Sequence, residues 1–373
     1  MTVAAETGPR TASHQAPFGI GAEEFRPRRL LANGHLQTIL GNFLPRHLHL
    51  SNPEAALVEV APPCVVAGAP QPAAQVLCHC HWQPAEGRAA ALTVILLHGL
   101  EGSSSSQYVL GNADKLWHAG CNVIRMNMRN CGGTEALSPT LYHSGLSGDV
   151  LAVMQHFAAR ESLLHVALVG YSMGGNLVLK LAGELGGQPP PMLCAVVGVS
   201  PAIDLGDSAD ALHEGFNRVY ERRFLRALLG RYRRKTELFP AIYDPARAAG
   251  VTSLRLFDDR ITAFYNSFDG ATDYYFRAAS ARVVDQIAVP TLILHALDDP
   301  FVRLSPATRL TLLANPHVTL LEPAHGGHCA FLADSNQATG DDGYWAEHTL
   351  LRFLLGQCRP VPAHEPGTHG NVR

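Results

Sequence analysis

The stretch 163–185, LLHVALVGYSMGGNLVLKLAGEL, decides the fold that this sequence predicts. Residues 166–169 form a short continuous apolar run, which is typical of a strand buried on both faces of a parallel sheet. After Ser172 the apolar residues recur at helical spacing up to Leu185, which predicts an amphipathic helix. The five residues between strand and helix, GYSMG, match the pattern G-x-S-x-G. They predict a sharp turn that presents Ser172 at the carboxyl edge of a sheet, and the simpler alternative is a glycine-rich turn with a surface serine.

The composition indicates a globular protein with one large α/β domain. The chain has 373 residues, of which 47% are hydrophobic, and this supplies a sizeable core and an inserted subdomain. The formal net charge is −3, from 29 basic and 32 acidic residues, so no general attraction to nucleic acid is expected.

The expected location is the cytoplasm. No apolar stretch approaches the roughly 20 residues that span a bilayer, and the first residues lack the apolar centre of a signal peptide. The eight cysteines show no regular framework spacing, which favours reduced thiols over a disulfide scaffold.

Apolar runs alternate with segments of helical length along the chain. This pattern is typical of a mostly parallel, twisted sheet with helices on both faces. Residues 146–160 repeat apolar side chains at helical spacing and predict a crossover helix. The apolar runs lie at 91–97, 121–126, 164–170, 195–199, 290–296 and 317–321.

The regular alternation stops between 203 and 286, where arginines and tyrosines cluster. We expect a mainly helical lid insertion there, above the carboxyl edge of the sheet, where open α/β folds bind ligands. The predicted parts are a flexible tail at 1–25, a first core part at 26–202, the lid at 203–286, a second core part at 287–358 and a flexible tail at 359–373.

One segment of the predicted lid, 220–235, reads as a basic amphipathic helix. Such a helix can rest on a membrane surface, and it can also be a lid helix whose arginines face solvent. The sequence leaves peripheral membrane contact open, and it makes no prediction of the oligomeric state.

A serine hydroxyl becomes a nucleophile only when a histidine takes its proton and a carboxylate orients that histidine. For the histidine we prefer His328, because the preceding glycine pair lets the loop fold back toward Ser172. His325 is the alternative that we interpret as structural. For the acid we prefer Asp299, which precedes a turn-fixing proline, and we interpret Asp298 as the cap of that turn.

A second turn follows the apolar run 93–97 and reads His98-Gly99-Leu100-Glu101-Gly102. A strand end at this place supplies one backbone N–H for a developing oxyanion. We therefore predict that Leu100 and Met173, the residue after the nucleophile, donate the two N–H groups. We interpret His98 as shaping the turn.

Together these residues resemble the YheT-like branch of the α/β-hydrolase superfamily, a group of predicted esterases related to the lipid-cleaving alpha/beta-hydrolase-domain proteins. The resemblance covers most of the chain, with Asn130 standing where many relatives carry glycine. It implies an α/β-hydrolase fold and a triad of Ser172, Asp299 and His328. Besides the elbow, the motifs that carry the resemblance are NGHLQT at 33–38, HGLEGS at 98–103, RNCGG at 129–133, YHSG at 142–145, FDD at 257–259, DYY at 273–275, DDPF at 298–301 and HGGH at 325–328.

The predicted function is hydrolysis of a small carboxylic ester with an apolar acyl chain, such as a monoacylglycerol, through an acyl-enzyme and without a cofactor or metal. One alternative is acyl transfer to an alcohol or thiol. The other is a ligand-binding protein that has kept the fold and lost turnover. A zinc site at 78–81, which reads CHCH, is disfavoured because neighbouring strand residues point to opposite faces.

Overall fold

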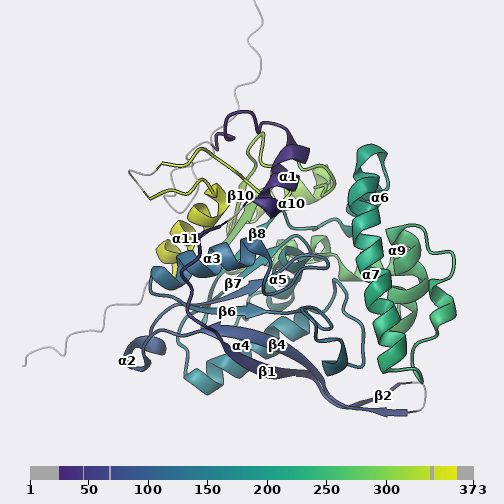
Figure 1. The fold of residues 1–373 in the computed structure, drawn as a ribbon. Helices are drawn as coiled ribbons and strands as arrows, with labels where there is room; N and C mark the ends of the chain where they lie inside the picture. The colour runs from purple at the N-terminus through teal and green to yellow at the C-terminus, as the bar shows by residue number, and fades with distance from the viewer. Residues whose placement is uncertain (1–24, 45, 67–68, 337–339, 359–373) are drawn as a thin grey trace, which may run out of the picture.

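An eight-stranded sheet forms the centre of the protein in this computed structural model, which describes residues 25–44, 46–66, 69–336 and 340–358 (Figure 1). The second strand of the sheet is antiparallel to both of its neighbours, the other seven strands point in one direction, and the last six of these pair in parallel. Both predicted tails lie outside the described residues, except for Phe25. In spatial order the strands are β1 (Glu54–Ala61), β4 (Ala74–His81), β6 (Asn122–Met126), β5 (Thr93–Leu97), β7 (Val166–Tyr171), β8 (Leu193–Val199), β9 (Thr291–Leu294) and β10 (Val318–Leu321).

The six predicted apolar runs are the six parallel strands. Every residue of β5, β6 and β7 is buried, which explains why these strands read as continuous apolar runs. Strand β1 is mostly exposed or half-buried, and β4 alternates buried with half-buried positions, so neither gives such a run. A separate short hairpin pairs β2 (Cys64–Val66) with β3 (Ala69–Gln71).

Helices cover both faces of the sheet. The predicted crossover helix is α4 (Ser147–Glu161), which packs beside α5 (Met173–Leu185) on one face. On the other face α3 (Gln107–His118) packs against β5 and β6, and α11 (Trp345–Gln357) packs against α3 and β8. At the far edge α10 (Pro306–Ala314) packs on β10, and α2 (Ala85–Arg88) is a short turn before β5.

The segment between β8 and β9, residues 203–286, contains helices and no strand, and all of these residues are described. We call it the insertion. Figure 1 shows its long helix α7 (Arg218–Leu238) beside α6 (Leu205–Leu212) and α9 (Ala271–Ala278), at one end of the sheet. Shorter pieces complete it, namely η2 (Gly215–Asn217), η3 (Pro245–Ala248), α8 (Leu254–Phe257), a π-helical turn (Asp258–Ala263), η5 (Ser280–Arg282) and η6 (Val284–Gln286). That the insertion acts as a lid stays a prediction.

The cysteines correct one expectation. Cys194 on β8 and Cys358, which follows α11, form a disulfide, so the prediction of reduced thiols is wrong for this pair. The partners lie 164 residues apart, and their spacing therefore carries no framework signal. The other six cysteines are free. The cytoplasmic location stays a prediction, and it loses the support that reduced thiols would have given.

Among the described residues, none of the helices combines the length and apolarity that a bilayer crossing requires.

The turns that follow β5 and β7 touch each other through their backbones. A Cβ on Gly174 would overlap the carbonyl oxygen of His98, and a Cβ on Gly170 would overlap that of Gly174. The two turns are therefore as close as glycine allows, and the end of β5 and the start of α5 share one corner of the sheet.

We predict that Gly170→Ala lowers the free energy of unfolding by about 1–3 kcal/mol, because the new methyl group must displace backbone atoms. Urea denaturation followed by circular dichroism measures this loss. Gly206→Ala in α6 is the matched control, since a Cβ there meets nothing within 4 Å and alanine favours a helix by about 0.5–1 kcal/mol. Equal stability of the two variants would contradict the close approach at Gly170.

Candidate active site

Ser172 lies at the junction between β7 and α5 with φ 54° and ψ −116°, a conformation that non-glycine residues rarely adopt. Its N–H donates to the carbonyl of Val199 at 2.9 Å, and its carbonyl accepts from Asn176 and Ala202. These bonds fix the backbone of both neighbouring segments around the serine. The half-buried side chain lines two cavities, as expected of an elbow that lifts a hydroxyl out of the sheet.

His328 and Asp299 are paired. The Nδ1 atom of His328 lies 2.8 Å from Oδ2 of Asp299, whose side chain is 1% exposed. The other carboxylate oxygen of Asp299 accepts the N–H groups of Phe301 and Val302 at 3.1 and 2.9 Å. One carboxylate therefore both closes its own turn and orients the imidazole.

Asp298 and His325, the two alternatives, form a separate contact. Oδ1 of Asp298 accepts the N–H of Gly327 at 2.8 Å, and its Oδ2 lies 3.4 Å from Nδ1 of His325. The turn-capping role that the sequence suggested for Asp298 belongs to Asp299, because the amides after Pro300 point at Asp299. Asp298 instead holds the loop that carries His328.

The Asp299 carboxylate stabilises the protonated form of the His328 imidazole relative to the neutral form. Burial lowers the pKa of His328, but Cys329 and the Asp299 carboxylate outweigh it and raise this pKa. A thiol carries charge only after it ionises, so near neutral pH the carboxylate is the group that raises the pKa. Burial raises the pKa of Asp299, and the nearby His328 outweighs that effect and lowers it. The pair thus stabilises the imidazolium that forms when His328 accepts a proton.

Helix α1 (Gly34–Phe43) supports the loop that carries His328. Oγ1 of Thr38 accepts the N–H of His328 at 2.8 Å, and the Gln37 amide bonds to both the N–H and the carbonyl of Leu332. A Cβ on Gly34 would overlap the carbonyl oxygen of Asp298. The motif at 33–38 carried a resemblance but no predicted role, because the partners of Gln37 and Thr38 lie about 300 residues away along the chain.

The turn after β5 lies against Ser172. A Cβ on Gly99 would sit 3.1 Å from that of Ser172, and Leu100 and Met173 line a cavity together with Ser172. His98 is buried, with Nδ1 2.8 Å from the Gly99 carbonyl and Nε2 accepting the Met128 N–H at 3.1 Å. Burial lowers the pKa of His98 to about 4, so it is a neutral structural residue. The structure brings all five predicted site residues to one corner of the sheet.

Glu101 ties this turn to the insertion. It adopts φ 57°, and its carboxylate accepts two hydrogen bonds from Arg231 of α7, at 2.9 and 3.0 Å. The Tyr142 hydroxyl donates to the same carboxylate at 2.5 Å. Buried charge pairs of this kind leave an uncompensated charge when one partner is removed, which costs about 3–5 kcal/mol. No motif or spacing indicated this contact, because its partners are 130 residues apart along the chain.

Two cavities meet at Ser172, Leu100, Phe224 and Phe301. The insertion cavity is lined mainly by apolar side chains of the insertion. The α1–α7 cavity lies between these helices and also contains His328. Since Phe43 on its wall is 68% exposed, this second cavity reaches the surface.

Asp258 is a buried acid on the wall of the insertion cavity. Burial raises its pKa to about 6, and it accepts the hydroxyls of Thr262 and Tyr275, both at 2.8 Å. It thereby joins the π-helical turn to α9. The motif FDD marked this residue in the sequence without indicating its partner.

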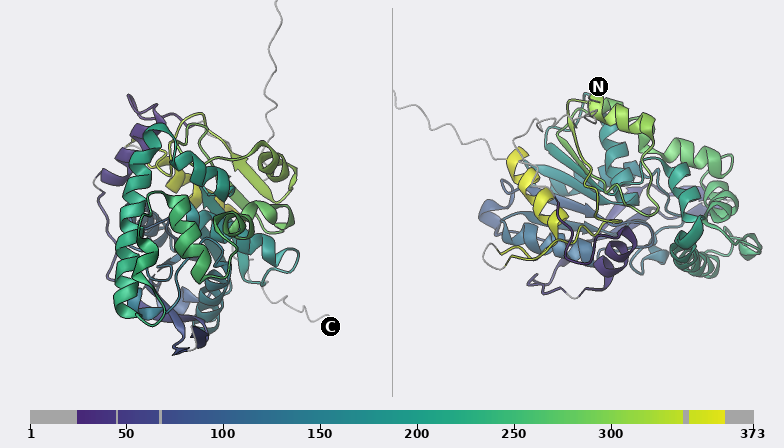
Figure 2. Two further views of the ribbon diagram at one scale, coloured as in Figure 1. Left: turned by 90° about the vertical axis from the view of Figure 1, so that its right-hand side faces the viewer. Right: turned by 90° about the horizontal axis from the view of Figure 1, so that it is seen from above.

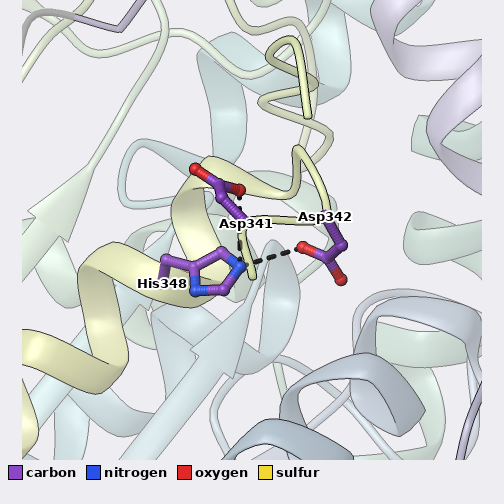
Figure 3. Close-up of side chains that lie close together, drawn as sticks. All are labelled: Asp341, Asp342 and His348. Atoms are coloured by element: carbon purple, nitrogen blue, oxygen red, sulfur yellow. Dashed lines mark hydrogen bonds and ion pairs between the residues drawn. The ribbon is translucent and has the colours of Figure 1, made fainter. Parts of the chain in front are cut away.

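One group of side chains offers several ligand atoms for a metal ion, and Figure 3 shows it. Nε2 of His348 lies 2.9 Å from Asp342 and 3.5 Å from Asp341, but Lys115 also contacts Asp342 at 2.5 Å. The ammonium group of Lys115 already balances this acid, and it also pairs with Glu347 at 2.8 Å. We therefore interpret the group as an ion-pair network that fixes the start of α11 to α3.

The segment CHCH lies on β4, and its cysteines and histidines have different surroundings, as strand alternation predicts. Cys78 and Cys80 are buried in the core beside α4. Nδ1 of His79 lies 2.8 Å from the Ser104 hydroxyl, and Nε2 of His81 accepts from Arg125 at 3.2 Å. The four side chains do not converge on one point.

Comparisons with known proteins agree with this architecture. A family model for the alpha/beta hydrolase fold matches residues 93–335. The predicted esterase YheT of Escherichia coli (strain K12) is 31% identical over 320 residues, which cover 83% of this chain and 87% of YheT. Phospholipase ABHD3 of Mus musculus is 29% identical, covering 64% of this chain and 58% of its own length. Monoacylglycerol lipase ABHD2 of Homo sapiens is 26% identical, with 72% of this chain and 66% of its own length covered.

We predict that Asp299→Asn lowers the pKa of the His328 imidazole by about 1–3 units, because it removes the negative charge that opposes burial. An NMR titration of the histidine ring signals measures this pKa. The control is Asp298→Asn, which keeps the Asp299 contact and leaves the pKa of His328 unchanged. A larger shift in Asp298→Asn than in Asp299→Asn would show that the pairing is wrong.

Proposed function

Because this chain belongs to the YheT-like branch of the α/β-hydrolase family, we propose that it is a serine-dependent carboxylic ester hydrolase that works through an acyl-enzyme. The observation that carries the proposal is the corner where Ser172, on a strained elbow, shares a cavity with His328, whose other ring nitrogen is 2.8 Å from Asp299. Nucleophile, base and orienting acid come from three different segments, in the chain order of α/β-hydrolases.

In the proposed reaction Oγ of Ser172 attacks the ester carbonyl carbon while Nε2 of His328 takes its proton. Asp299 holds Nδ1–H of the ring, so Nε2 is left to face the cavity. The tetrahedral intermediate then expels the alcohol, which takes the proton from His328, and the acyl group stays on Ser172. Water attacks this ester in the same way, with His328 again as base, and releases the acid.

The oxyanion of each tetrahedral intermediate would accept the N–H groups of Leu100 and Met173. Met173 begins α5, and a helix N-terminus leaves its first N–H groups without intrahelical partners. Leu100 comes from the turn that Glu101 ties to α7, so the Glu101–Arg231 contact supports the position of this second donor. Removing one such donor typically costs about 10²–10³-fold in turnover.

The proposed acyl site is the insertion cavity. Its wall beside Ser172 and Met173 is formed by apolar side chains such as Leu205, Leu228 and Phe257, which suit a hydrocarbon chain better than a polar group. Each methylene moved from water into such a site contributes about 0.8 kcal/mol. The relatives named as a phospholipase and a monoacylglycerol lipase support a lipid-like ester. The leaving alcohol would then occupy the α1–α7 cavity.

We predict that Ser172→Ala lowers kcat/KM for p-nitrophenyl esters by about 10⁴-fold or more, because the variant lacks the hydroxyl that attacks the ester carbonyl. The assay uses a series of esters from acetyl to palmitoyl, so that a preference for long chains does not hide the activity. Equal thermal stability of variant and wild type shows that the loss is chemical.

The matched control is Ser105→Ala, which removes an exposed hydroxyl from the turn after β5 and keeps full activity. Turnover that survives in Ser172→Ala at the wild-type rate would show that the nucleophile is wrong. Absence of turnover in the wild type over the whole series would remove the support for a general esterase.

A further inference from the structure

The outer face of α7 carries four arginines that form no ion pair within the described structure. Arg222, Arg223, Arg226 and Arg233 are exposed and make no ion pair with any residue that the structure describes. Some other exposed arginines of the insertion are paired, for example Arg255 with Asp210 and Arg277 with Asp273. Positive charge therefore gathers along one side of a single helix.

The inner face of the same helix is held to the core. Arg231 bonds to Glu101, Arg234 lies 2.5 Å from Glu135, and the buried ammonium of Lys235 donates to the carbonyls of Glu135 and Ser138. These contacts fix how α7 is turned about its axis. The arginine side therefore faces solvent, and none of its four guanidinium groups lies within ion-pair distance of a described acid in the structure.

Exposed apolar side chains lie at the N-terminal end of this arginine side. Phe216 and Val219 are 57% and 52% exposed. The ring of Phe216 packs on His35 of α1 with centroids 4.9 Å apart, and His35 also contacts the Tyr220 hydroxyl at 3.1 Å. Figure 2 (left) shows α1 beside this end of α7. On α1 itself, Leu36 and Phe43 are 45% and 68% exposed.

The α1–α7 cavity reaches the surface at this same face. Phe43 and Arg223 line it, and Ser172 and His328 lie within it. A route to the serine is thus bordered by side chains of two kinds, large apolar groups and unpaired guanidinium groups. Water is a poor environment for the large apolar groups, and the guanidinium groups form no ion pair with a described residue.

We propose that the α1–α7 face docks on an anionic lipid surface, with the apolar side chains in the headgroup boundary and the arginines of α7 on lipid phosphates. An amphipathic element with arginines beside aromatic and aliphatic residues has the chemistry of an interfacial anchor. The net charge of −3 does not oppose this, because charges farther than about 8 Å are screened at physiological salt. The idea that the lipid surface supplies the ester rests on the proposed function. The docking itself does not depend on that function.

The test is flotation of the full chain with large unilamellar vesicles at physiological ionic strength. One set contains phosphatidylcholine with about one-third phosphatidylglycerol, and the other contains phosphatidylcholine alone. We expect the wild type to float with the anionic vesicles only. The double variant Arg222→Glu/Arg226→Glu is expected to bind at least about tenfold more weakly, since each arginine near an anionic surface contributes about fivefold.

Matched variants separate docking from general charge and from catalysis. Arg309→Glu/Arg352→Glu makes the same change of net charge on α10 and α11 and keeps wild-type flotation. Phe216→Ser weakens flotation without any change of charge. Ser172→Ala floats like the wild type, so a failure of the proposed function leaves this test intact. A circular dichroism spectrum and a thermal unfolding midpoint like those of the wild type show that Arg222→Glu/Arg226→Glu is folded.

Three outcomes would overturn the docking surface. The first is absence of the wild type from the anionic vesicle fraction. The second is equal loss of flotation in both double variants, which would make net charge the cause. The third is binding of duplex DNA that Arg222→Glu/Arg226→Glu abolishes while vesicles are ignored, which would show a polyanion site.

Discussion

The close backbone approach between the turns after β5 and β7 is the constraint on which the rest of the site depends. Gly174 allows it because it carries no Cβ, Gly170 allows the elbow itself to close, and Ser172 within this elbow adopts an unfavourable φ of 54°. Strain of this kind persists only when surrounding contacts hold it, and here the backbone bonds to Val199 and Ala202 do so. The serine and the N–H groups of Leu100 and Met173 therefore belong to one rigid corner.

Two further segments are brought to this corner by contacts that span the chain. Helix α1 holds the His328 loop through Thr38 and Gln37, and α7 holds the turn after β5 through Arg231 and Glu101. Both helices also form the walls of the cavity that reaches the surface. The elements that position the chemistry are thus the ones that define access to it, and this links the proposed ester hydrolysis to the proposed lipid surface.

The sequence predicted those elements of the fold that local residue patterns determine. Continuous burial made the six parallel strands readable, and the change of period after Ser172 located α5. Strands β1 and β4 were not predicted, because their partly exposed positions interrupt the apolar runs. The Cys194–Cys358 disulfide, the Glu101–Arg231 pair and the role of Thr38 join residues 130 to 290 positions apart, and no spacing rule reveals such partners. The predicted triad residues lie together, and their catalytic roles stay a prediction.

The most direct test of the account is covalent labelling with a fluorophosphonate, followed by intact mass and peptide mapping. An activated serine attacks phosphorus and keeps the adduct, so the account predicts one modification per chain, on Ser172. It also predicts that His328→Ala, which removes the base, abolishes the adduct in a folded protein. Absence of labelling in the wild type, or an adduct on Ser172 that persists at full rate in His328→Ala, would contradict the central claim.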